Sequence, residues 1–219
     1  MNAFDIIGPV MIGPSSSHTA GAARIGSVAR QLLREEPATA EITLYGSFAQ
    51  TYKGHGTDRA LIGGLLGFEP SDARLRDSFS LAKAAGLAFS FELAENAAFH
   101  PNTARLVLTG KKGAAVEVMA ASVGGGAISV TEVNGVEVSF TAQYFTTVIF
   151  NEDKPGVMAD VTRVLASNLI NIAFLRLFRK ESHAIMVIET DQEVPSRLEE
   201  ELARIKNVDK VLMIRPFSK

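Results

Sequence analysis

The last third of the chain has the most regular pattern of hydrophobic and polar residues. Short runs rich in valine, isoleucine and phenylalanine predict four β-strands, over 144–150, 170–180, 183–190 and 208–216. Two segments place apolar residues three or four positions apart, which predicts amphipathic helices over 155–167 and 195–205. The order βαββαβ is typical of the ferredoxin-like fold, whose two helices cover one face of an antiparallel sheet. The other face would be bare, so we expect a second copy of the domain to cover it.

The preceding residues are less regular and predict an α+β domain. Apolar residues at Ile25, Val28, Ala29 and Leu32 lie on one helical face, which predicts a helix over 20–34. Other expected helices cover 59–66 and 72–85, and expected strands cover 41–46, 88–93, 105–109, 115–120, 127–133 and 136–140. Segment 6–14 predicts a strand or loop, 54–58 a loop, and Asn134-Gly135 a type I′ hairpin turn. We therefore expect two domains, 1–142 and 146–219.

The composition excludes several kinds of chemistry. The 219 residues include no cysteine, so this chain forms no disulfide, has no thiolate nucleophile and ligates no iron–sulfur cluster through sulfur. A formal net charge of -2 gives no electrostatic reason to expect nucleic acid or an anionic membrane as partner. The sequence begins without a basic leader and has no long apolar run, so we expect no signal peptide, no membrane span and a cytoplasmic location.

The first candidate site is the run Gly13-Pro-Ser-Ser-Ser-His-Thr-Ala-Gly21 at the start of the first helix. Free N–H groups at a helix N-terminus attract a carboxylate or phosphate, and hydroxyls add uncharged donors. They belong to Ser15, Ser16, Ser17 and Thr19. His18 could donate or accept a proton near neutral pH. A solvated serine-rich turn with an ordinary N-cap explains the same residues about as well.

Two glycine-rich segments are further candidates. In Lys53-Gly-His-Gly-Thr-Asp58 the glycines would leave His55 accessible beside Thr57 and Asp58, and Asp58 could orient an imidazole. The alternative is a surface turn in which Thr57 or Asp58 caps a helix. The segment Ser122-Val-Gly-Gly-Gly126 has backbone N–H groups that a ligand could approach, or it is a plain connector; its glycines are Gly124, Gly125 and Gly126.

A fourth candidate is the turn from the first strand to the first helix of the ferredoxin-like domain. Its helix N–H groups could hold a ligand carboxylate, or the turn could be merely an acidic capped loop. The residues in question are Asn151, Asp153, Pro155 and Gly156. His100 and His183 are expected to be ordinary loop and turn residues. No metal-ligand spacing, P-loop or Ser-His-Asp signature occurs in the sequence.

These segments together resemble a known family. The serine–histidine run, Tyr45-Gly-Ser with Lys53-Gly-His-Gly-Thr-Asp58, His100-Pro-Asn-Thr103 and Ser122-Val-Gly-Gly-Gly126 resemble, in this order, the motifs of iron–sulfur-dependent L-serine dehydratases. The second domain, with Asp153-Lys-Pro-Gly156, resembles an ACT domain. The first domain is also similar to the allosteric substrate-binding domain of some D-3-phosphoglycerate dehydrogenases.

The resemblance implies a beta subunit that converts L-serine to pyruvate and ammonia without pyridoxal phosphate. In the family a [4Fe-4S] cluster binds the substrate hydroxyl as a Lewis acid, and cysteines of the alpha subunit hold that cluster. His18 and His55 are then the expected catalytic residues. The other residues of the first three candidate segments would bind substrate: Ser15, Ser16, Ser17, Thr19, Thr57, Asp58, Gly124, Gly125 and Gly126.

The resemblance also leaves a second function open. The chain could be a regulatory serine-binding module without catalysis, of the kind found in phosphoglycerate dehydrogenases. The ACT domain could bind a regulator through Asn151, Asp153, Pro155 and Gly156, and we expect it to mediate self-association.

Overall fold

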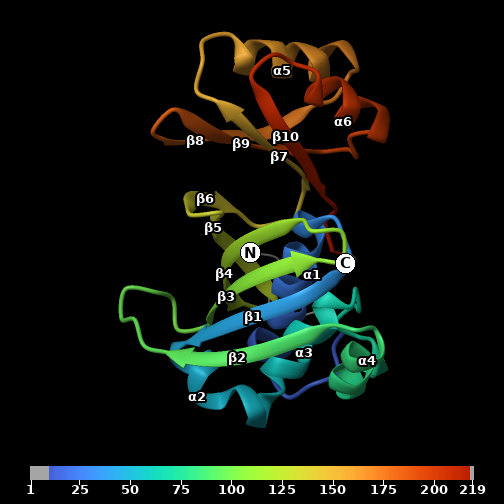
Figure 1. The fold of residues 1–219 in the computed structure, drawn as a ribbon, viewed down its shortest axis with the longest axis vertical. Helices are drawn as coiled ribbons and strands as arrows, with labels where there is room; N and C mark the ends of the chain where they lie inside the picture. Colours follow the sequence, from blue (N-terminus) through green and yellow to red (C-terminus); the bar gives the residue numbers. More distant parts are fainter. Residues whose placement is uncertain (1–9, 218–219) are drawn as a thin grey trace. The chain divides into compact units, whose positions relative to one another are not determined.

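The structure is a computed structural model that describes residues 10–217. The chain divides into two compact units, the first ending at Gly135 and the second beginning at Val136 (Figure 1). The division at 142–146 expected from the sequence stays a proposal. No helix within residues 10–217 has the length and apolar character needed to cross a membrane.

A six-stranded sheet with the order β2-β1-β3-β4-β5-β6 organises the first part of the chain. Its strands are β1 Pro37–Tyr45, β2 Ala88–Ala94, β3 Thr103–Gly110, β4 Ala115–Gly124 and β5 Ala127–Val133 of the first unit, and β6 Val136–Phe140, with which the second unit begins. Strands β1 and β2 are parallel, as a helical crossover between them requires. Asn134 and Gly135 have φ values of 51° and 72°, as the predicted type I′ turn demands.

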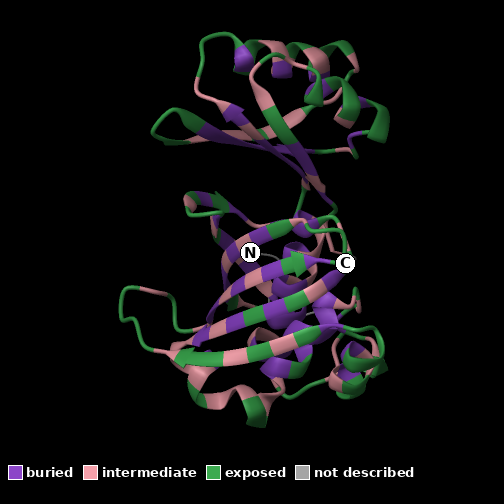
Figure 2. Cartoon of the chain, viewed as in Figure 1, coloured by how far each residue is buried: buried purple, intermediate pink, exposed green. Residues whose placement is uncertain are grey.

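The helices of the first unit are a π-helix, four α-helices and one 3₁₀ segment. They are the π-helix Ser16–Gly21, α1 Ala22–Leu33, α2 Gly46–His55, α3 Thr57–Leu65, the 3₁₀ segment Ala73–Asp77 and α4 Ser78–Ala84. All four apolar positions of the predicted α1 face are fully buried, which confirms that periodicity. Helix α1 packs on α3, and Figure 2 shows the buried residues gathered on the helices under the sheet.

Several local predictions were wrong. Segment 54–58 is not a loop: α2 ends at His55, Gly56 adopts a left-handed φ of 70°, and α3 begins at Thr57. Only Phe48 of α2 is buried, so this helix carries almost no hydrophobic period. Strand β1 begins at Pro37, a strand-start position where proline's missing N–H is tolerated.

Three further boundaries differ from the prediction. The expected helix over 72–85 splits into the 3₁₀ segment and α4, and Gly124 belongs to β4 rather than to a loop. Residues 10–14 form a loop, one of the two outcomes expected for this segment, and 6–9 lie outside the described residues. Gly156 caps α5, so the helix expected from Pro155 begins at Val157.

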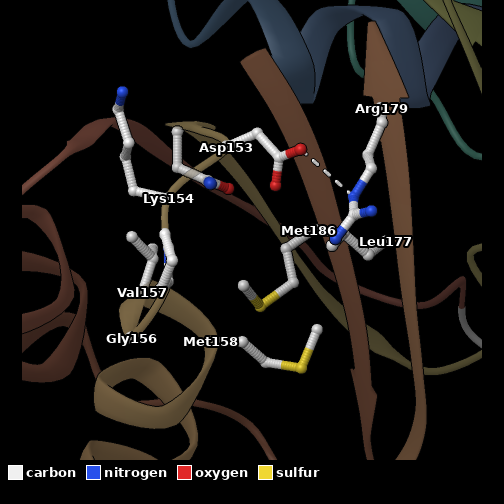
Figure 3. A pocket seen from close by; sticks show the side chains of 10 residues that line it. Asp153, Lys154, Gly156, Val157, Met158, Leu177, Arg179 and Met186 are labelled. Atoms are coloured by element: carbon white, nitrogen blue, oxygen red, sulfur yellow. Dashed lines mark ion pairs between the residues drawn. The ribbon is translucent and has the colours of Figure 1, made fainter. Parts of the chain in front are cut away.

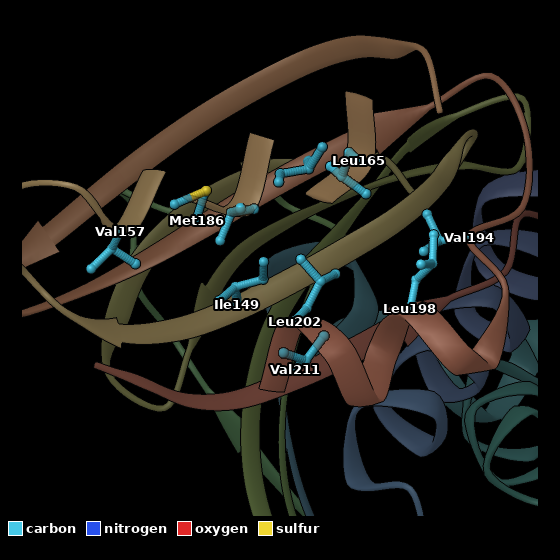
Figure 4. Packing of buried hydrophobic residues seen from close by; sticks show 10 residues of the cluster. Ile149, Val157, Leu165, Met186, Val194, Leu198, Leu202 and Val211 are labelled. Atoms are coloured by element: carbon cyan, nitrogen blue, oxygen red, sulfur yellow. The ribbon is translucent and has the colours of Figure 1, made fainter. Parts of the chain in front are cut away.

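The second unit contains the βαββαβ order predicted from the sequence. Its elements are β7 Phe145–Glu152, α5 Val157–Ser167, β8 Ile172–Lys180, β9 His183–Thr190, α6 Ser196–Ala203 and β10 Val208–Ile214. The antiparallel sheet has the order β10-β7-β9-β8. Figure 4 shows its core, where Val161 and Leu165 of α5 and Leu202 of α6 pack against Ile149 and Met186.

Part of the opposite face of this sheet is covered within the second unit itself. Strand β6, which begins this unit, packs against β8 and β9. Self-association through this domain stays a proposal.

Candidate active site

His18 lies in the π-helix and is held at both ring nitrogens. Ser15 caps this helix: its Oγ accepts the His18 backbone N–H at 3.4 Å and lies 3.2 Å from Nδ1. On the other side, Nε2 is 3.2 Å from Ser47 Oγ at the start of α2. Single π-helical turns are frequent at functional sites. The serine–histidine run is thus a shaped turn that fixes the His18 ring, and not a solvated loop.

The structure brings the two predicted histidines together. The ring of His55 meets the His18 ring edge-to-face, with centroids 4.7 Å apart, and Phe48 packs on His18 at 5.3 Å. Burial lowers the pKa of His18, and the charge of His55 lowers it further. His18 is therefore neutral at pH 7 and able to accept a proton.

Several buried polar atoms around the π-helix have no hydrogen-bond partner within residues 10–217. They are Thr19 Oγ1, His55 Nδ1, Thr57 Oγ1, Asn102 Oδ1 and Ser122 Oγ. A buried polar group without a partner costs about 1–3 kcal/mol. Because these unpaired polar atoms gather around the π-helix, they indicate a site that is completed by a ligand or by another chain.

Within the described residues, the Asp58 side chain makes no hydrogen bond with His18 or His55. Its Oδ1 accepts the N–H of Arg59 at 2.7 Å, and the residue is 8% exposed. Burial raises the pKa of Asp58, while the Arg59 N–H and the Arg59 charge act against that rise. The suggestion that Asp58 orients an imidazole is therefore wrong for this geometry, whereas its proposed contact with substrate is untested.

The glycine segment after Ser122 forms a tight turn beside α1. Gly124, Gly125 and Gly126 all have positive φ, at 105°, 58° and 79°. Arg24 of α1 donates through Nη1 to the carbonyl of Gly126 at 2.8 Å, which fixes the turn. Ser16 and Ser17 are half-buried in the first turn of the π-helix.

Sequence reasoning missed three polar side chains at this site. Ser47 binds His18, Ser122 lies against Gly21 of the π-helix, and the N–H of Ser122 donates to the carbonyl of Asn102 at 2.9 Å. All three occur in the motifs quoted above, where attention went to histidines and glycines. His100 and His183 are exposed, as loop and turn residues are expected to be.

A second candidate site lies in the other unit, at the turn between β7 and α5. All four residues expected there line a pocket of about 400 Å³, together with Lys154, Val157, Met158, Leu177, Arg179 and Met186. Figure 3 shows Asp153 and Arg179 paired across it, with Nε of Arg179 3.2 Å from Oδ2 of Asp153.

Comparison with known proteins identifies the family. The family model "Serine dehydratase beta chain" matches residues 2–86, and the model "ACT domain" matches residues 145–207. The chain is 45% identical over 213 residues to the probable L-serine dehydratase beta chain of Bacillus subtilis, covering 96% of both chains. It is 40% identical over 197 residues to the L-serine dehydratase beta chain of Peptoniphilus asaccharolyticus, covering 89% of this chain and 88% of the other.

The chain belongs to the L-serine dehydratase beta chain family. It is also 26% identical over 195 residues to D-3-phosphoglycerate dehydrogenase of Bacillus subtilis, which covers 88% of this chain but 37% of that enzyme. The α+β architecture with a ferredoxin-like ACT domain agrees with the fold expected from the sequence.

The side chains of this beta chain do not form a ligand set that could hold an iron–sulfur cluster. The sequence has no cysteine, and within residues 10–217 no three His, Asp or Glu side chains gather closely enough to hold a metal ion. In the described part of the chain, His18 and His55 form a pair without a third such ligand. Thiolates for a cluster would have to come from another chain.

Proposed function

We propose that this beta chain is one subunit of an L-serine ammonia-lyase that converts L-serine to pyruvate and ammonia. The observation that carries the proposal is the contact between His18, buried in the serine-rich π-helix, and His55 of α2, in a chain 45% identical to a named L-serine dehydratase beta chain. The partner is an alpha subunit. Because this chain lacks thiolates, we assign the ligands of any [4Fe-4S] cluster to that subunit. We place the enzyme in the cytoplasm.

The residues of this chain bind the substrate and accept its proton. The π-helix N-terminus and its hydroxyls suit the α-carboxylate, with Ser15, Ser16, Ser17 and Thr19 as donors. Thr57, Asp58 and the glycine turn form the remaining contacts. His18 is neutral because burial and His55 lower its pKa, so His18 can take up the α-proton. His55, whose ring contacts that of His18, is the second candidate for this role.

Mutagenesis of the reconstituted enzyme tests these roles. We expect His18→Ala and His55→Ala to lower kcat by about 10²–10⁴-fold in a heteromer assembled anaerobically with the alpha subunit. His183→Ala, which replaces an exposed histidine, is the matched control. Circular dichroism of each variant reports whether it folds. Near-normal turnover in both folded site variants would remove the histidines from catalysis.

The similarity to phosphoglycerate dehydrogenase supports one alternative, a regulatory serine-binding module without catalysis. That function requires L-serine binding by the isolated chain and no cysteine-bearing partner. Affinity purification from the native host distinguishes the two. Recovery of a stoichiometric iron-containing chain supports the lyase, whereas serine binding without such a partner supports the module.

We infer a regulatory role for the second pocket. Asn151, Asp153, Pro155 and Gly156 line one cavity, which supports binding of a small molecule that modulates the enzyme. Self-association through the ACT domain is part of the same proposal. Sedimentation velocity of the full-length chain and of a chain without its ACT domain would test it, and a full-length chain that sediments as a monomer would count against it.

A further inference from the structure

A small pocket of the first unit, beside the π-helix, is lined by positive charge. Its volume is about 350 Å³, at the small end of the range for ligand sites. Lys53, Arg59 and Arg76 line it, and no Asp or Glu occurs among its described lining residues. Three like charges around so small a space repel one another. Their convergence indicates that an anion completes the pocket.

Carboxylates of this chain do not neutralise these cations. Within residues 10–217 none of the three forms an ion pair, whereas Arg74, on the same 3₁₀ segment as Arg76, pairs with Asp72. Asp58 lies outside the lining, and its Oδ1 accepts the backbone N–H of Arg59. Asp58 therefore occupies part of the N-terminus of α3, while the charged ends of the three side chains remain for a ligand.

The Arg59 side chain is held in place for such a ligand. Its Nη1 donates to the carbonyl of Arg76 at 3.0 Å, and its guanidinium lies 6.0 Å from the centroid of the Phe79 ring. Nζ of Lys53 lies 5.5 Å from the centroid of the Tyr52 ring. A guanidinium has five N–H donors in a fixed fork. Most of the donors of Arg59 are thus left for an anion, on a side chain that is already oriented.

The pocket also contains a buried hydroxyl without a partner. Thr19 is 3% exposed, and its Oγ1 has no hydrogen-bond partner in the part of the chain that the structure describes. Gly13 lines the same pocket, and Oγ1 is the atom nearest to its open side, 2.1 Å from where a Cβ would be. A hydroxyl can donate to an anion oxygen. Thr19 therefore supplies an uncharged donor beside the three cations.

These groups favour a compact dianion over an amino acid. L-Serine carries one ammonium as well as one carboxylate, and the lining would repel the ammonium. A phosphate group carries about two negative charges at neutral pH and has three strong acceptor oxygens. Arginine and lysine are the residues that bind such groups. Ile12, Pro14 and Leu75 add an apolar wall that admits a short carbon chain.

We propose that this pocket binds a phosphate dianion, either as the free ion or as the head of a small phosphate monoester. Lys53, Arg59 and Arg76 supply the charge, and Thr19 the hydroxyl. The inference goes beyond the proposed lyase function and does not depend on it. It assigns a role to two arginines that the serine-binding motifs leave unexplained.

Calorimetry on the full-length chain tests the inference, at an ionic strength held constant with NaCl. We expect inorganic phosphate and sulfate to bind at one site, and the monoanion acetate to bind about tenfold or more weakly. Arg59→Gln and Lys53→Gln should each weaken phosphate binding about tenfold or more, because each removes a charge-assisted hydrogen bond. Arg74→Gln is the matched control, because Arg74 lies on the same 3₁₀ segment as Arg76 but outside the pocket lining.

A monoester distinguishes the two sources of the phosphate group. Isobutyl phosphate carries the same head on a short apolar chain. Tighter binding than that of inorganic phosphate supports a monoester site, and weaker binding supports a site for the free ion. Either result requires that Arg59→Gln weakens the binding.

The possible failures can be told apart. Circular dichroism reports whether each variant folds, and Lys53 is exposed, so Lys53→Gln remains informative even where Arg59→Gln fails to fold. Phosphate binding unchanged in the folded variants, or no heat beyond that of added NaCl, would overturn the inference. Binding that disappears in the heteromer would also overturn it, since the cations would then pair with carboxylates of the alpha subunit. Serine turnover is measured separately, so its loss beside intact phosphate binding would refute only the lyase assignment.

Discussion

Gly26→Ala is the sharpest test of the packing that holds the π-helix in place. Gly26 lies where α1 crosses α3, and a Cβ added to it would be 2.3 Å from the carbonyl oxygen of Leu61. Opposite it, a Cβ on Gly64 would be 2.0 Å from the carbonyl oxygen of Ala23. Both contacts are with backbone, which no rotamer change relieves. An alanine at position 26 must therefore push the two helices apart by about 1 Å, since ordinary contact begins near 3.4 Å.

The magnitude follows from two opposing effects. Overpacking a tight contact costs about 1–3 kcal/mol, and more where backbone must move. Alanine regains about 1 kcal/mol over glycine in a helix interior. Because the clash is with a backbone oxygen, the cost lies at the upper end of this range, and we expect Gly26→Ala to lower the free energy of unfolding by about 2 kcal/mol. At about 2–4 °C per kcal/mol, Tm falls by about 4–8 °C.

Urea denaturation and thermal unfolding, followed by circular dichroism, measure this change. The matched control is Gly54→Ala in α2, because a Cβ at Gly54 would have no atom within 4 Å. The same substitution there should be neutral or stabilising by up to about 1 kcal/mol. A Gly26→Ala protein as stable as the wild type would refute the close helix crossing. Since α1 continues directly from the π-helix, the variant should also lower serine turnover.

Three other changes have defined outcomes. Asp58→Asn removes a buried charge whose pKa is raised, so urea denaturation should find the variant at least as stable as wild type at pH 7, with this advantage vanishing below about pH 3.8. His18 has a pKa below 6.5, so wild-type stability should fall as pH drops below 6.5. Ser47→Ala, which removes the hydrogen-bond partner of His18 Nε2, should lower the free energy of unfolding by about 1–3 kcal/mol at pH 8. Leu165→Ala should destabilise the second unit by about 2–5 kcal/mol in thermal unfolding, whereas Leu169→Ala, at an 87% exposed position, should change stability by about 0.5 kcal/mol or less.

Elements whose side chains repeat with a clear period could be predicted from the sequence. Helix α1 presents its apolar residues on one buried face, and helices α5 and α6 of the ferredoxin-like unit do the same. The Asn134-Gly135 turn is predictable for another reason, because few other residue pairs tolerate positive φ at both positions. In each case the information lies within a short window of the sequence.

Features that depend on distant segments could not be predicted in this way. Strand β6 packs against β8 and β9 of the ACT sheet, yet nothing in its alternating pattern says which surface it packs against. Ser122 and Asn102 are ordinary loop-like residues in the sequence. They become part of the candidate site because the ends of β3 and β4 are paired, with Thr103 opposite Ala121.

The histidine pair illustrates how a missed helix changes the reading of a motif. The Gly-His-Gly segment predicted a loop that exposes His55, but the chain there is the last turn of α2. Phe48 and His55 are seven residues apart, which places them on the same face of that helix, about 10 Å apart along its axis. The ring of His18 contacts both, and Ser47 of the same helix binds its Nε2. Gly56, with its left-handed φ, then ends α2 directly after His55. The glycines therefore serve to end a helix that presents His55 to His18, and the pairing follows from helical geometry rather than from a flexible loop.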